Sequence, residues 1–218
     1  MNEVNIGRIV LGMTQTNCYY LHSIGGRGKD REINESDAIV FDPADRGKEI
    51  YDLLMGKGLR VAAILLTHGH FDHIGGVNEL RELSGAKVYA AKEEEKLCAD
   101  AALNISAEIG IPITISIDNF LSDGEEHTSA GMTFRVIATP GHTPGGLCFY
   151  FPEGQLLISG DTLFKESVGR TDFPGGSMKT LINSIRKQLF ILPDDTRVFS
   201  GHGEATTIGD EKKNNPFV

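Results

Sequence analysis

Short apolar runs separated by turn-forming residues dominate the first half of the chain. Residues 4 to 12, NCYYLHS and AIVFDPAD each have the composition of a β-strand, and the charged stretch GGRGKDREINESD between the last two favours an exposed hairpin. GKEIYDLLMGKG places Ile50, Leu53 and Leu54 at helical spacing with Gly58 near its end, which predicts a short amphipathic helix. VAAILL then predicts a buried strand that runs directly into THGHFDHIGG.

The same succession of elements continues to the end of the sequence. VNELRELSG and MKTLINSIRKQLFIL predict helices, as do residues 92 to 109, whose three consecutive glutamates (93 to 95) are expected on a solvated face. KVYAA, MTFRVIATP, LCFYF, QLLISGD and RVFSGH predict strands. Each half runs from strands to helices, and histidine-bearing turns recur after strands. We therefore expect one α/β domain over residues 1–218, with two mixed sheets packed together and helices outside.

Composition and charge narrow the classes of function. The chain has 218 residues, 40% apolar and 23% charged, as expected of an ordinary globular protein with a substantial core. Its formal net charge is −9 and no stretch is rich in lysine or arginine, so nucleic-acid binding is not expected. No apolar run has the length of a signal peptide or membrane span, which favours a cytoplasmic protein. Cys18, Cys98 and Cys148 are expected as reduced, buried residues.

The strongest chemical signal is a group of three histidines and an aspartate within six residues. His68, His70, Asp72 and His73 follow the predicted strand VAAILL, and Gly69 lets the backbone turn between the first two. Imidazole and carboxylate ligands together suit zinc, iron or manganese. Burying these groups without a metal would cost about a few kcal/mol for each group left unpaired. The stretch therefore predicts a metal-binding loop.

Three further residues occupy the same context, a strand end followed by small residues. They are His142 in ATPGHTPGG, Asp161 in LLISGDTLF and His202 in RVFSGHGE. Each alone could equally shape a turn, but together with the loop they complete a site of seven side chains. His22 and His127 lack this context. Thr67, Ser159 and Thr162 flank the candidate ligands, and they either hold the imidazoles by hydrogen bonds or only shape the turns.

HxHxDH followed by a distant His, Asp and His resembles the metallo-β-lactamase superfamily over nearly the whole chain. The resemblance implies a four-layered αββα sandwich and two divalent metal ions, with zinc as the first expectation and iron or manganese as alternatives. It implies that the first ion is bound by His68, His70 and His142, the second by Asp72, His73 and His202, and that Asp161 bridges the two.

Within that superfamily the chain is similar to the short bacterial glyoxalase II type, the hydroxyacylglutathione hydrolases. The similar stretches are TNCYYL, THGHFDH, TPGHTPG, SGDTLF, VGRTDFPGG and the end of the chain from SIRKQLFILPDD to NNPF. This type lacks the helical C-terminal domain that binds glutathione in longer enzymes. The resemblance implies a thioesterase whose small-molecule substrate is S-D-lactoylglutathione or a related acyl-thioester.

In such an enzyme two ions lower the pKa of a shared water, and a metal-bound hydroxide attacks the thioester carbonyl. Asp161 and Asp72 are then the expected catalytic carboxylates: Asp161 sets the spacing, and Asp72 either binds the second ion or orients the water. Arg170 in SVGRTDFPGG either contacts a substrate carboxylate or only pins its own loop, and Asp172 or Phe173 could line the same pocket.

Three other interpretations remain. A stretch such as GRTDF also resembles persulfide dioxygenases, which use one iron, although the GHGEATTIGDE ending is closer to the hydrolases. A dinuclear site also opens lactones and β-lactams. A non-catalytic metal-binding protein of the same fold is expected to have gaps in the ligand set, and none of the seven positions is missing here. The sequence leaves open the native metal, the number of ions bound, the thiol carrier and the oligomeric state.

Overall fold

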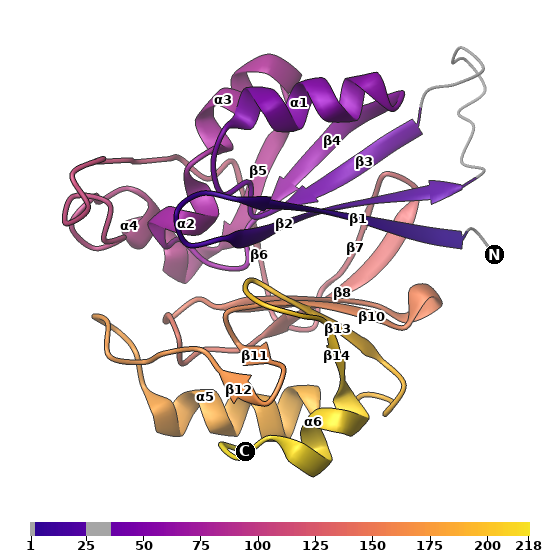
Figure 1. The fold of residues 1–218 in the computed structure, drawn as a ribbon, viewed down its shortest axis with the longest axis vertical. Helices are drawn as coiled ribbons and strands as arrows, with labels where there is room; N and C mark the ends of the chain where they lie inside the picture. The colour runs from indigo at the N-terminus through magenta and orange to yellow at the C-terminus, as the bar shows by residue number, and fades with distance from the viewer. Residues whose placement is uncertain (1–2, 25–35) are drawn as a thin grey trace.

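Two six-stranded sheets face each other in the computed structural model, with helices on the outer face of each (Figure 1). The structure describes residues 3–24 and 36–218, so the expected charged hairpin lies outside the described residues. The sheets have the strand orders β1-β2-β3-β4-β5-β6 and β14-β13-β10-β9-β8-β7, and β11 and β12 form a separate ribbon. This is the αββα sandwich of two mixed sheets that the sequence predicts.

The first sheet changes from antiparallel to parallel at β3. Its strands are β1 (Glu3–Leu11), β2 (Thr16–Ile24), β3 (Ser36–Phe41), β4 (Leu59–Leu65), β5 (Lys87–Ala91) and β6 (Asn119–Leu121). Strands β3 to β6 run parallel, and helices α1 (Gly47–Gly56) and α3 (Val77–Ser84) connect them across the outer face. Because parallel strands end at the same edge, the loops after β3 and β4 lie side by side.

The second sheet is antiparallel except between β10 and β13. Its strands are β7 (Glu126–Ser129), β8 (Met132–Ala138), β9 (Leu147–Phe151), β10 (Leu156–Gly160), β13 (Arg197–Ser200) and β14 (Thr206–Thr207); the ribbon is β11 (Leu163–Phe164) and β12 (Ser167–Val168). Helix α5 (Met178–Ser184), continued by a π-helical turn over Ile185–Leu189, and helix α6 (Ile208–Asn214) cover its outer face. Among the described residues no helix is both long and apolar enough to cross a membrane.

Alternate side chains of the central strands face different cores, as the pleat of a strand requires. In β3, Ala38 and Val40 pack beneath α1 and α3, whereas Ile39 and Phe41 belong to the core between the sheets. In β9, Cys148 belongs to the core under α5 and α6, and its neighbours face the other sheet. Strands buried on both faces explain the unbroken apolar runs. All three cysteines are buried and free, as expected.

The prediction of a helix over residues 92 to 109 is wrong beyond Cys98. A 3-10 turn (Lys92–Glu94) and the short helix α4 (Glu95–Cys98) are followed by turns. The buried Asn104 side chain donates to the carbonyl of Ile113 at 2.9 Å, and the Ser106 hydroxyl accepts from the amide of Ile113, also at 2.9 Å. Such bonds between side chain and backbone offer the chain an alternative to the helix.

Candidate metal centre

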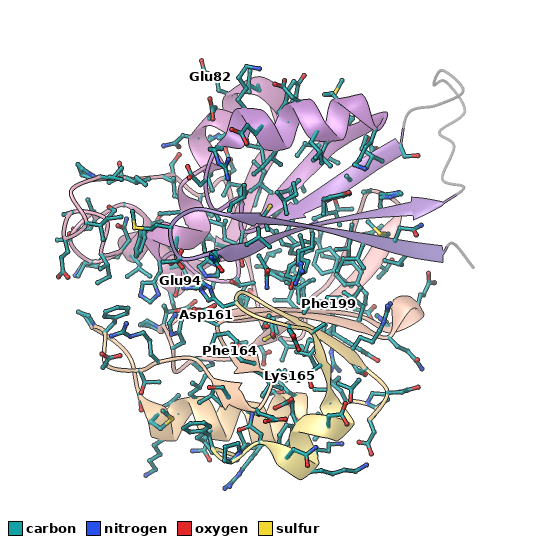
Figure 2. The ribbon with its side chains drawn as sticks, in the orientation of Figure 1. Glu82, Glu94, Asp161, Phe164, Lys165 and Phe199 are labelled. Atoms are coloured by element: carbon teal, nitrogen blue, oxygen red, sulfur yellow. The ribbon has the colours of Figure 1, made fainter. Side chains whose placement is uncertain are left out.

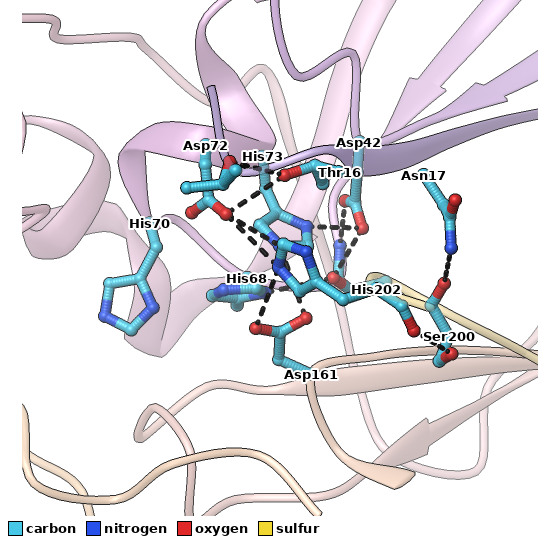
Figure 3. Close-up of polar contacts among 12 residues, drawn as sticks. Thr16, Asn17, Asp42, His68, His70, Asp72, His73, Asp161, Ser200 and His202 are labelled. Carbon is cyan, nitrogen blue, oxygen red and sulfur yellow. Dashed lines mark hydrogen bonds and ion pairs between the residues drawn. The ribbon is translucent and has the colours of Figure 1, made fainter. Parts of the chain in front are cut away.

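The seven side chains singled out from the sequence come together between the two sheets, at one end of the sandwich. Figure 3 labels six of them, all but His142. All seven follow strands: His68 and His70 lie in the loop after β4, Asp72 and His73 in the single-turn helix α2 (Phe71–Ile74), His142 between β8 and β9, Asp161 directly after β10 and His202 one residue beyond the end of β13. The first sheet therefore supplies four of the seven side chains and the second sheet three.

The first cluster consists of His68, His70 and His142. The Nε2 atom of His142 lies 2.9 Å from Nδ1 of His70 and 3.2 Å from Nε2 of His68. All three side chains are buried. Burial, together with the neighbouring imidazoles, holds the pKa of His68 well below its ordinary value and lowers the pKa of His70 to about 3. Neutral imidazoles with converging nitrogens are the form that binds a metal.

A second polar partner fixes the orientation of two of these rings. Nδ1 of His142 donates to the backbone carbonyl of Arg170 at 2.6 Å, because a carbonyl can only accept. The Thr67 hydroxyl donates to Asp42 at 2.7 Å and therefore accepts from Nδ1 of His68 at 3.1 Å. Both rings are thereby left with an unprotonated Nε2 directed into the cluster, as in protein metal sites.

The second cluster consists of Asp72, His73 and His202. The carboxylate of Asp72 lies 3.3 Å from Nε2 of His202 and 3.8 Å from Nε2 of His73. Burial lowers the pKa of His202, but hydrogen bonds to Asp161 and Asp72 outweigh it and raise this pKa to about 9. Burial raises the pKa of Asp72, but His73 and His202 outweigh it and lower this pKa to about 2. The cluster thus attracts positive charge.

Asp161 lies between the two clusters. Its Oδ2 atom is 3.6 Å from Nε2 of His142 in the first and 3.5 Å from Nε2 of His202 in the second. Its Oδ1 atom is 3.4 Å from Nε2 of His73. Oδ1 of Asp161 and Nε2 of His73 are both buried without a hydrogen-bond partner among the described residues. A buried carboxylate oxygen and imidazole nitrogen left in this state fit a divalent cation, which accepts both as ligands.

Two residues that the sequence analysis did not single out support the second cluster. Asp42, directly after β3, accepts from the Thr67 amide at 2.8 Å and from Nδ1 of His73 at 3.0 Å. Thr16, at the start of β2, donates to the carboxylate of Asp72 at 3.0 Å. Asp42 directly follows the apolar run AIVF, as Asp161 follows an apolar strand, so the position after a strand could have identified Asp42 in the sequence. Thr16 follows a turn, and no such pattern marks it.

Thr67 therefore forms a hydrogen bond to a candidate ligand, which is the first of the two alternatives considered for the flanking residues. The other two flanking residues make different bonds: Ser159 donates to the carbonyl of Leu163, and the Thr162 hydroxyl pairs with that of Thr139 at 2.9 Å. Neither of these two bonds reaches a candidate ligand. His22 and His127 lie in β2 and β7 and belong to none of the three metal-ligand groups found among the described residues.

Glu94 corrects the expectation that all three glutamates of residues 93 to 95 are solvated. Its side chain is fully buried (0% exposed) and accepts from the amide of Gly69 at 2.7 Å and from the amide of Gly145 at 2.7 Å. Gly69 stands between His68 and His70, and Gly145 follows His142 by three residues. Glu94 thus ties together the two loops of the first cluster, and Figure 2 places it at the same end of the sandwich as Asp161.

The site opens into a cavity of about 490 Å³ whose wall includes Arg170 and Phe173. The Phe173 ring lies 5.3 Å from the ring of His70, and the guanidinium of Arg170 lies 4.0 Å above the Phe173 ring. The same guanidinium donates to both carboxylate oxygens of Asp172, at 2.7 and 2.6 Å. Arg170 therefore pins its own loop, while its side chain stays exposed beside the cavity.

Comparisons with known proteins agree with this geometry. The family model described as "Metallo-beta-lactamase superfamily" matches residues 11–202. The hydroxyacylglutathione hydrolase GloC of Haemophilus influenzae is 37% identical over 85% of this chain and 89% of its own length. The crystal structure of the B3 metallo-beta-lactamase BLEG-1 superposes with a TM-score of 0.88 at 40% identity, covering 98% of this chain and 99% of that one. That of TTHA1623, in a di-iron-bound form, has a TM-score of 0.83 at 36% identity and covers 97% and 100%.

Proposed function

Because this chain belongs to the metallo-beta-lactamase superfamily and is a metal-dependent hydrolase, we propose that its two clusters bind two divalent ions and that it hydrolyses acyl-thioesters. S-D-lactoylglutathione is the first candidate substrate, since the relative GloC is named for hydroxyacylglutathione hydrolysis. The observation that carries the proposal is the position of the Asp161 carboxylate, within 3.6 Å of a histidine nitrogen of each cluster.

In this proposal His68, His70 and His142 hold the first ion, Asp72, His73 and His202 hold the second, and Asp161 contacts both. Zinc is the first candidate, and iron is supported by the di-iron form of TTHA1623. When bound, such ions lower the pKa of a water ligand and polarise a carbonyl group. In hydrolysis the water oxygen bonds to the carbonyl carbon and the carbon–sulfur bond breaks, which yields a carboxylic acid and a thiol.

The remaining residues orient the groups that react. Thr16 holds one oxygen of Asp72, so the carboxylate can bind the second ion or, where that ion is lacking, accept a hydrogen bond from the attacking water. Asp42 fixes the His73 ring through Nδ1. A thiolate leaves without needing a proton at neutral pH, because its conjugate acid has a pKa of about 8.5. Because this leaving group needs no general acid, a site made of metal ligands suits a thioester.

The test is turnover by protein loaded in turn with zinc, iron or manganese, with bound metal counted per chain. We expect thiol release from S-D-lactoylglutathione or another acyl-thioester, and a loss of at least about a hundredfold in Asp161→Asn, because a shared ligand exceeds the tenfold to hundredfold effect of outer groups. The exposed Asp52→Asn serves as the matched control and should retain full activity. Absence of thiol release with every metal contradicts the proposal.

A second candidate activity is hydrolysis of β-lactams, which BLEG-1 favours by its name and its 40% identity; lactones, which a dinuclear site can also open, belong to the same test. The same preparations should be assayed with a cephalosporin and with an acyl-lactone. Oxygen uptake with glutathione persulfide tests the third candidate, a dioxygenase with one iron. Turnover of one of these compounds in the absence of thioester hydrolysis would replace the proposed function.

A further inference from the structure

A second cavity, of about 240 Å³, opens beside the metal centre and differs from the first in chemistry. Its wall is made of the turn between β1 and β2, the loop after β3, the helix α2 and the segment 109–113. We call it the isoleucine groove, after the apolar side chains that line it: Met13, Phe71, Ile109, Ile111 and Ile113. Met13 is 70% exposed and Ile111 is 53% exposed, so these large apolar groups face open space.

The groove lies next to the cavity at the metal centre, because Thr14, Phe71 and Asp72 belong to the walls of both. Asp72 is the candidate ligand of the second ion, so the groove begins beside the place where a reacting carbonyl would lie.

The groove wall is also held in place before any ligand binds. The Phe71 amide donates to the carbonyl of Asn104 at 3.0 Å, and the Asn104 side chain in turn donates to the carbonyl of Ile113. These hydrogen bonds fix Asn104 and Ile113, which both belong to the segment beyond α4. Asn104 is also fully buried. A preformed apolar cavity next to convergent polar groups is the usual form of a small-molecule site.

The side chains of the groove indicate which part of a thioester fits it. Most of them are apolar, and its two carboxylates are balanced in the proposed enzyme, because Asp45 pairs with Arg46 at 3.9 Å and Asp72 would hold the second ion. Among the described residues no lysine or arginine belongs to its wall, so the groove offers no cationic partner to the two carboxylates of glutathione. The neutral acyl part of the substrate is therefore the part that suits the groove.

We propose that the isoleucine groove binds the acyl chain of the thioester and that acyl groups longer and more apolar than lactoyl are the preferred substrates. The inference rests on the proposed thioesterase function. A lactoyl group consists of a methyl group, a hydroxyl-bearing carbon and the carbonyl, so it would leave most of this space empty and would place its hydroxyl against isoleucine side chains. Each additional methylene removes further apolar surface from water.

The experiment is a series of glutathione thioesters with acetyl, butyryl, hexanoyl and lactoyl groups, assayed by thiol release. We expect kcat/KM to rise about two- to fourfold per methylene, the effect of burying a methylene partly or fully. Ile111→Ser should lower the ratio of hexanoyl to acetyl turnover at least about threefold, by removing apolar contact. Ile191→Ser, which changes another exposed isoleucine that does not line the groove, should leave the ratio unchanged.

A binding measurement separates the groove from catalysis. S-hexylglutathione and S-methylglutathione are thioethers that cannot be hydrolysed. The methyl resonance of Met13 in the NMR spectrum of zinc-loaded protein reports contact with either compound. We expect the hexyl compound alone to shift that signal.

Thioester turnover that is independent of chain length, with no shift at Met13, overturns the groove assignment but leaves the thioesterase proposal standing. Failure to hydrolyse any member of the series overturns both. A Met13 signal that changes with protein concentration and not with ligand would assign the groove to a second copy of this chain and would likewise overturn the inference.

Discussion

At the scale of single residues, the buried carboxylate of Glu94 shows how the first cluster is held. The amides it accepts from belong to loops on opposite sides of the cluster, those of Gly69 and Gly145. Burial raises the pKa of Glu94, against the effect of these hydrogen bonds. These bonds join Glu94 to the backbone and to none of the three histidines of the first cluster. We therefore regard Glu94 as a positioning residue that acts through the backbone.

Glu94→Gln should weaken metal binding at the first cluster about tenfold to hundredfold, the range for groups that orient metal ligands. The amide nitrogen of glutamine would face a backbone N–H, and a buried donor left unpaired costs about 1–3 kcal/mol. Competition titration with a metal indicator measures the affinity, and thermal unfolding checks that the variant folds. Glu93→Gln, at the exposed neighbouring position, is the control. Equal metal affinity in both variants would contradict this role.

At the scale of elements, the site depends on how β10 and β13 end. These strands are parallel neighbours; Asp161 follows β10 directly, and His202 follows β13 after Gly201. The amide of Gly201 donates to the carbonyl of Gly160 at 2.8 Å, and its own carbonyl accepts from the Asn17 amide at 2.7 Å. Gly201 thus joins the two strand ends to β2 of the opposite sheet.

Gly201→Ala should disrupt the second cluster. A Cβ atom at this position would overlap the Asp161 carboxylate and lie 2.7 Å from Cε1 of His73. Neither group can move without leaving the cluster, so we expect a loss of at least about tenfold in affinity for the second ion. Gly56→Ala, at the end of α1 where a Cβ atom meets nothing within 4 Å, should bind metal normally. Metal content after dialysis distinguishes the two, and two ions retained by Gly201→Ala would refute the expectation.

At the scale of the whole molecule, the two sheets meet at the candidate metal centre. The loop after β4 and helix α2 bring candidate ligands from the first sheet, and the strand ends of the second sheet bring the rest. The core between the sheets, which includes Phe41, Phe134, Phe149 and Phe151, joins them independently of any ion. Bound ions would therefore add to the stability of a fold that the aromatic core already supports.

Removal of metal should lower the melting temperature without unfolding the protein at room temperature. A ligand present at 100 times its dissociation constant stabilises the folded state by about 2.7 kcal/mol. For a chain of this length each kcal/mol corresponds to about 2–4 °C, so each ion should contribute about 5 to 10 °C. Calorimetry with and without a chelator measures the difference, and Asp161→Asn should show a smaller one. An unchanged melting temperature on chelation would contradict metal binding between the sheets.

The amino-acid sequence alone determined the local features of this protein. The period of apolar residues predicts most strands and the helices α1, α3 and α5, because burial on one or both faces leaves a repeating pattern. The density of His68, His70, Asp72 and His73 predicts a metal-binding loop, because few other environments satisfy so many buried imidazoles. The recurrence of strand, small residues and a polar side chain predicts the other ligands.

Tertiary structure decided what depends on contacts between distant segments. That Asp161 lies between the clusters, that Glu94 is buried while its neighbours are exposed, and that residues beyond Cys98 form turns rather than a helix all follow from packing against segments remote in sequence. The isoleucine groove likewise exists only where the turn after β1 meets the segment 109–113. Local pattern carries no information on such pairings, because the free energy that fixes them comes from surfaces and hydrogen bonds that form only when the chain is folded.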